Sequence, residues 1–127
     1  MLENLRKWFV IHFVVDIFVA VPLLLVPEQA LNFLGWEIVD PIASRMVAAA
    51  FFAIGLESYL GRNAGFEAYS NMLDLKIIWS TLVIVGLVLS IIQGSVSNPL
   101  VLWMIVFVFL IFDFVWIYWR IRLAKRT

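Results

Sequence analysis

Four ionisable side chains stand inside long apolar stretches of this sequence and are its best candidates for chemistry: His12, Asp16, Glu57 and Asp113. A charged group at the centre of a bilayer costs about 2.5–3.5 kcal/mol on insertion scales, and such groups usually mark ligand, proton or ion sites. His12 and Asp16 are four residues apart, so they share one face of a helix. A carboxylate beside a histidine could bind a polar ligand in a way that depends on the protonation of the histidine.

All four side chains are predicted to lie in the same half of the membrane. At about 1.5 Å per helical residue from the nearest basic residue, His12 and Glu57 lie roughly 7–8 Å inside, Asp113 roughly 10 Å and Asp16 roughly 13 Å. Two interpretations fit this layer. The side chains could converge on a polar cavity that opens to the cytoplasm, or they could pair with one another, with Lys76 and with hydroxyl groups to hold the helices in register.

These residues are carried by four apolar segments, at about residues 8–26, 42–61, 75–92 and 100–119. Each segment has close to the ~20 residues that a helix needs to cross a bilayer. Hydrophobic residues make up 65% of the chain, above the ~45–50% that is usual in soluble domains. We therefore predict an all-α integral membrane protein in which residues 1–127 form one four-transmembrane-helix bundle. Residues 67–76 should extend the third helix, and Pro27 and Gly35 should bound a short interfacial helix in the first loop.

Positive charge is sorted to one side of these segments. Eight of the nine Lys and Arg side chains lie at or beyond the same ends: Arg6, Lys7, Arg62, Lys76, Arg120, Arg122, Lys125 and Arg126. The positive-inside rule then places both termini in the cytoplasm and the loops 27–41 and 93–99 outside. The basic residues 120–126 should lie against anionic lipid headgroups.

Arg45 is the exception, because it lies roughly 5 Å inside the outer boundary of the second segment. We expect its side chain to extend toward the outer phosphates, with an anion or headgroup site as the alternative. Its candidate partners within the chain are Glu37, Asp40 and the carbonyl of Phe18, which Pro22 leaves without a helical hydrogen bond.

Composition argues against several function classes. The chain has no cysteine and one histidine, so one subunit offers neither thiolates nor several imidazoles, and no metal or cofactor is predicted. Its net charge is zero, which provides no basic field to attract nucleic acid. Motifs for phosphate binding, serine or metal-dependent hydrolysis and DNA binding are absent from the sequence, and no catalytic residue is predicted.

Small residues mark two surfaces for helix packing. The second segment is rich in alanine, glycine and serine. The third helix carries a stripe of small residues at intervals of four: Gly86, Ser90 and Gly94. Small side chains let helices approach closely inside lipid. Either surface could pack within the bundle, or it could join a second copy of the chain or a larger membrane complex. The lipid bilayer is the other expected partner.

The start of the second segment resembles a known family. Residues 40–50 are Asp-Pro-Ile-Ala-Ser-Arg-Met-Val-Ala-Ala-Ala, and Ala-Ile-Gly follows at 53–55. An arginine that leads a small-residue run in this way resembles the second helix of DoxX-like small four-helix proteins of prokaryotes, and the loop layout is similar over most of the chain. The resemblance implies a prokaryotic inner (cell) membrane and, for some members, an accessory role beside membrane oxidoreductases. A more distant similarity, to four-helix sterol-isomerase-like folds, implies acidic residues in a lipid-accessible cavity.

These observations favour a binding function over an enzymatic one. We expect the chain to bind a lipid-like or small amphipathic ligand, with a carrier role as one form of that activity. Asp16, Glu57 and Asp113 would line the cytoplasm-facing cavity, and His12 would set its protonation. The first alternative is an accessory or assembly subunit of a larger membrane complex. The second is a membrane-embedded acid–base enzyme of the isomerase type, for which His12 with Asp16 or Glu57 is the candidate couple.

Overall fold

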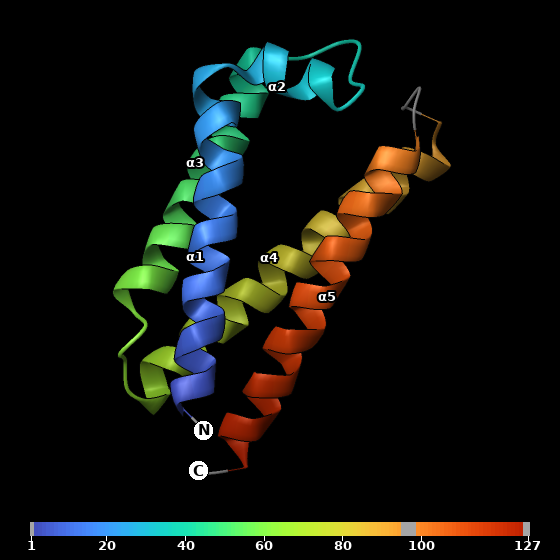
Figure 1. The fold of residues 1–127 in the computed structure, drawn as a ribbon. Coiled ribbons are helices and arrows are strands. Elements are labelled where there is room, and N and C mark those ends of the chain that lie inside the picture. Colours follow the sequence, from blue (N-terminus) through green and yellow to red (C-terminus); the bar gives the residue numbers. More distant parts are fainter. Residues whose placement is uncertain (1, 95–98, 126–127) are drawn as a thin grey trace. The chain divides into compact units, whose positions relative to one another are not determined.

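The computed structural model describes residues 2–94 and 99–125, and that part of the chain is almost entirely helical. Five helices follow one another along it (Figure 1): α1 Leu2–Leu25, α2 Pro27–Phe33, α3 Pro41–Leu60, α4 Phe66–Ile92 and α5 Pro99–Ala124. The four longer helices are each long and apolar enough to cross a membrane. The all-helical class and the four potential spans are therefore confirmed, and they indicate a multi-pass membrane protein.

The helices extend beyond the predicted apolar segments at their charged ends. Helix α1 begins at Leu2, α5 continues to Ala124, and α4 begins at Phe66, so residues 67–76 are helical as predicted. With 27 residues, α4 is about 40 Å long, more than the ~30 Å of a hydrocarbon core. Lys76 lies within α4, where the predicted extension meets the apolar segment, and it is only 1% exposed.

The chain divides into two compact units between Ala64 and Gly65. In the first unit, α1 and α3 pack side by side in opposite directions, and α2 lies at the end where α1 leads into α3 (Figure 1). The buried residues of α1 recur every three or four positions, as packing along a neighbouring helix requires: Leu5, Phe9, His12, Asp16, Ala20 and Leu23. His12 and Asp16 therefore occupy positions that apolar residues hold elsewhere on the same face.

The connection between α1 and α3 follows from its capping residues. Pro27 begins α2, where its missing N–H costs nothing, and Glu28 lies in the first turn. Gly35 has a φ of 98° just past the helix end, and the amides of Gly35 and Trp36 donate to the carbonyls of Asn32 and Leu31. This arrangement is the glycine-dependent C-terminal cap. The predicted short helix is thus present, with Gly35 ending it.

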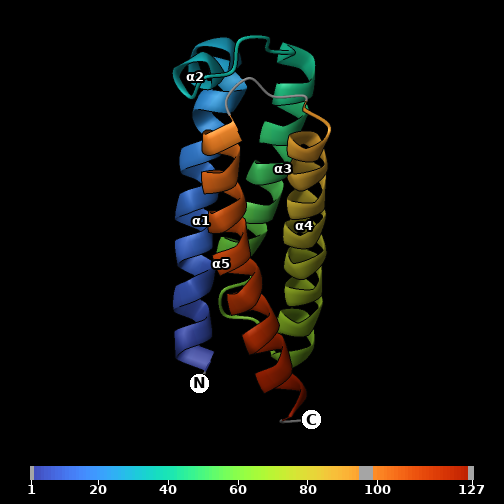
Figure 2. The same ribbon diagram turned by 90° about the vertical axis from the view of Figure 1, so that its right-hand side faces the viewer.

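In the second unit, α4 and α5 run in opposite directions and pack against each other (Figure 2). Helix α5 buries bulky side chains along one face: Leu102, Val106, Trp116, Trp119 and Leu123. Most of the predicted outer turn 93–99 lies outside the described residues, as does Arg126. Gly94 is described, but it follows the end of α4 with a φ of 69°. Gly94 therefore lies just outside the helix, and within α4 the predicted small-residue stripe consists of Gly86 and Ser90.

A polar cluster between α1 and α3

The structure brings together the two ionisable side chains that the sequence placed on one face of the first helix. His12 Nε2 lies 3.2 Å from Asp16 Oδ2, and the two residues are only 4% and 3% exposed. The spacing of four residues within α1 accounts for this contact, since it stacks one side chain above the other. A buried acid and a buried histidine are therefore in contact in the core of the first unit.

Ser58 of α3 completes the cluster from the opposite helix. Its Oγ lies 3.3 Å from His12 Nδ1 and also donates to the carbonyl of Ile54 at 2.9 Å. Because a hydroxyl has a single hydrogen, the bond to Ile54 leaves Oγ to accept from an Nδ1–H. In the tautomer with a proton on Nδ1, His12 donates to Ser58 Oγ, while Nε2 faces the Asp16 carboxylate. Ser58 is fully buried, so its hydroxyl meets the imidazole of His12 inside the core of the first unit.

Gly55 sets how closely α1 and α3 approach at this level. A Cβ built on Gly55 would lie 2.8 Å from the Cβ of Asp16, closer than side chains tolerate without moving. The absence of a side chain at this position therefore allows α3 to pass directly over Asp16. The small residues of the second segment have at least this use within the first unit, where Ala48 and Ser58 are buried as well.

The other two acids predicted for the site have different surroundings. Glu57 precedes Ser58 on α3 and is half-buried, but in the part of the chain described here its carboxylate makes no hydrogen bond or ion pair. Asp113 belongs to the second unit, where its Oδ2 accepts a hydrogen bond of 3.0 Å from the Thr81 hydroxyl of α4. His12, Asp16 and Ser58 are thus the residues that direct contacts join.

Arg45 binds none of the three partners suggested by the sequence. Its Nε donates to the carbonyl of Leu24 at 3.0 Å. Leu24 lies in the last turn of α1, where carbonyls have no amide of the same helix to accept from, so a side-chain donor is favourable there. Asp40 instead caps α3, and its carboxylate accepts from the amides of Ile42 and Ala43. Arg45 therefore ties the end of α1 to the start of α3.

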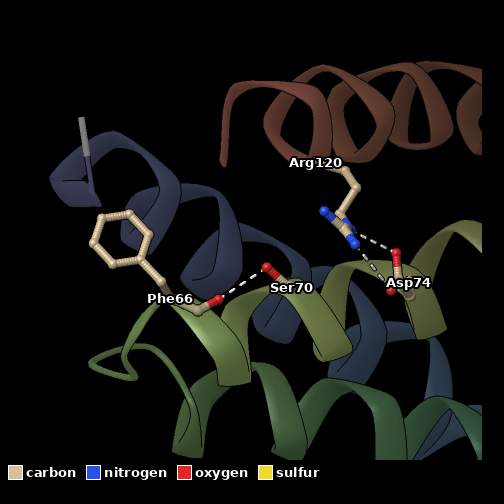
Figure 3. Close-up of polar contacts among 4 residues, drawn as sticks. All are labelled: Phe66, Ser70, Asp74 and Arg120. Atoms are coloured by element: carbon tan, nitrogen blue, oxygen red, sulfur yellow. Dashed lines mark hydrogen bonds and ion pairs between the residues drawn. The ribbon is translucent and has the colours of Figure 1, made fainter. Parts of the chain in front are cut away.

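An ion pair in the second unit was not foreseen from the sequence. Arg120 of α5 reaches Asp74 of α4, with Nε–Oδ1 at 2.7 Å and Nη2–Oδ2 at 3.4 Å (Figure 3). One turn from Asp74, the Ser70 hydroxyl donates to the carbonyl of Phe66 (Figure 3). Both Arg120 and Asp74 retain partial exposure, at 34% and 49% of their side chains.

A simple register rule could have identified this pair. Asp74 with Arg120 and Thr81 with Asp113 are separated by 46 and 32 residues, and both pairs are centred on position 97. Residues equally distant from the turn between two antiparallel helices of equal rise must lie at the same height. The rule requires only the position of the turn, which the sequence predicted.

Searches against known proteins returned no relative: no family model, no curated protein and no solved structure matches this chain. The function must therefore be argued from the residues and contacts described above.

Proposed function

We propose that this chain is a four-span protein of the prokaryotic cell membrane, arranged as a helical bundle with both termini in the cytoplasm. We further propose that it binds the polar group of a small amphipathic or lipid-like molecule at His12, Asp16 and Ser58 and acts as a carrier for it. The observation that carries the proposal is the buried His12–Asp16 contact of 3.2 Å within a helix that could span a membrane.

The cost of burial favours a function for this contact. Ionisable side chains within membrane helices are expensive and usually mark sites that bind or transfer something polar. Replacing a buried ion pair by apolar residues is often neutral or stabilising, so stability alone is a weak reason to retain one. The competing explanation is that the cluster only holds α1 and α3 in register, a role that we call a register pin and that requires no ligand.

The neighbours of the cluster suggest the class of ligand. Phe9 and Ala20 are buried on the same face of α1 as the cluster, and the rings of Phe13 and Tyr59 of α3 meet at a tilt of 35° with 4.7 Å between their centroids. A molecule with one polar group and an apolar body would match a polar centre that is surrounded in this way. Glu57 is a secondary candidate on α3, and Asp113 is retained as a candidate in its own unit.

Purification in a mild detergent tests this proposal against an accessory-subunit role. Gly86 favours the subunit alternative, because a Cβ at this exposed position of α4 would meet nothing within 4 Å, which leaves room for a partner helix. A monomer or homodimer that releases a small amphipathic molecule on denaturation would support the carrier. Stoichiometric co-purification of another membrane protein, with no released small molecule, would favour the subunit.

The proposed orientation depends on the eight-to-one distribution of Lys and Arg. Single cysteines can report it cleanly, because the chain has none of its own. A cysteine at Glu37 should react with a membrane-impermeant maleimide added to intact cells, and one at Asn63 should react only after the cells are opened. The reverse pattern would overturn the orientation.

A further inference from the structure

The end of α5 that carries the basic residues has two arginines with different surroundings. Arg120 is bound to Asp74 of α4. Arg122, two residues later, donates from Nη1 to the Tyr118 hydroxyl at 2.7 Å. In residues 2–94 and 99–125, no carboxylate lies within ion-pair distance of Arg122 or Lys125. The positive charge of Arg120 is thus balanced within the second unit, and the charges of Arg122 and Lys125 are not.

Helical spacing places the unbalanced charges on one face. Tyr118, Arg122 and Lys125 are at positions i, i+4 and i+7, so they lie along a single stripe of α5. All three residues are exposed in the structure. We call this stripe the α5 basic face. Its residues all belong to α5, whereas the His12–Asp16 cluster is formed by residues of α1 and α3.

Tyr118 holds the Arg122 side chain back along α5, toward the middle of the helix. The tyrosine lies one turn nearer the middle of α5, and the guanidinium carbon is 5.6 Å from the centre of its ring and 6.0 Å from that of Trp119. Tyrosine and tryptophan favour the headgroup level of a bilayer. Held against these rings, the guanidinium would lie near the lipid phosphates once α5 spans a bilayer, whereas an arginine without such contacts would extend toward water.

We propose that the α5 basic face binds the phosphate of an anionic phospholipid in the adjacent leaflet. A guanidinium has five N–H donors, and the Tyr118 hydroxyl occupies one of them. The others can hold a phosphate in the two-point geometry that arginine favours. Lys125 adds a second positive charge one turn away. Because an anionic lipid brings a net negative charge to these two cations and a zwitterionic lipid does not, the face should select for anionic headgroups.

Lipid titration of the purified full-length protein tests this assignment. Native mass spectrometry would count bound phosphatidylglycerol and phosphatidylcholine for the wild type, for Arg122→Gln and for Lys7→Gln. The last is a matched loss of one exposed cation on α1. We expect wild type to prefer phosphatidylglycerol, and Arg122→Gln to bind it about five-fold more weakly, since one basic residue near the surface contributes about 1 kcal/mol. Lys7→Gln should change the affinity less than two-fold.

Three results would overturn the proposal. One is an equal loss of affinity in Arg122→Gln and Lys7→Gln, which would show diffuse attraction without a site. Another is equal binding of the two lipids by wild type. The third is competition by millimolar inorganic phosphate, which would assign the face to a soluble anion.

The Tyr118→Phe variant separates the positioning of Arg122 from its charge. It retains every cation but removes the hydrogen bond to Arg122, so it should weaken phosphatidylglycerol binding. Unchanged binding would contradict the positioning role.

Discussion

The two units place their main polar contacts at the same sequence separation but in opposite environments. His12 with Ser58 and Asp74 with Arg120 are each 46 residues apart, and each contact joins two antiparallel helices. The first contact is almost completely buried, and the second is about one-third to one-half exposed. The pairing of helices therefore determines which residues meet, whereas burial determines the free energy that is lost when a contact is removed.

The difference has an energetic consequence. In the buried cluster every polar atom that loses its partner incurs a full desolvation cost. At the exposed ion pair, water and salt replace a lost partner at little cost. Changes in the first unit should therefore have larger effects than similar changes in the second, and matched substitutions can test that ordering.

Glycine substitutions should give the largest contrast. Gly55→Leu inserts a side chain where even a Cβ would lie 2.8 Å from Asp16, so α1 and α3 must separate. We expect a loss of about 1–3 kcal/mol or more from overpacking, seen as a lower thermal midpoint in detergent. Gly86→Leu fills open space and should leave the midpoint unchanged or raise it. Equal loss in both variants would remove the special role of Gly55.

Serine substitutions should give an intermediate contrast. Ser58→Ala removes the hydroxyl that contacts His12 Nδ1 in a buried position, which should cost about 1–3 kcal/mol. Ser90→Ala removes only a bond to the Gly86 carbonyl one turn earlier on its own helix and should change stability by less than about 0.5 kcal/mol. Both can be measured as shifts in thermal midpoint. A harmless Ser58→Ala would mean that His12 does not need this partner.

The exposed ion pair should give the smallest effect. Asp74→Asn should cost about 0–1 kcal/mol because both partners remain accessible to solvent. The difference from wild type should shrink further between low and high salt, since exposed charges are screened. Glu67→Gln, in the first turn of α4, provides a control for loss of one acid. A salt-independent loss of several kcal/mol would show that this pair behaves like the buried cluster.

Much of the helical layout was accessible from the sequence because hydrophobic length is a strong signal. All four spans and the short helix after Pro27 were predicted, and the pairing of His12 with Asp16 follows from a spacing of four residues. Hydrophobicity alone does not locate the helix ends, because the apolar segment ends before the helix does: α4 begins at Phe66, and its polar part was predicted only as the extension over residues 67–76.

The contacts between helices were harder to predict. Asp74 and Arg120 are far apart in sequence and carry no motif, and only the register about position 97 connects them. The basic residues 120–126 were treated as one group facing lipid, yet Asp74 engages Arg120 and Tyr118 engages Arg122. Composition sets the charge of such a segment, whereas contacts with neighbouring side chains determine which charges remain available to bind lipid.

The Asp16→Asn variant tests most directly whether the buried cluster is a ligand site or a register pin. Asparagine keeps the shape of the side chain and most of its hydrogen bonding but removes the charge. The measurement compares thermal midpoints and, by mass spectrometry, the small molecules released from equal amounts of purified wild type and variant. We predict that the variant stays folded and releases much less of the amphipathic molecule found with wild type. Equal release from both proteins would contradict the ligand site and support the register pin.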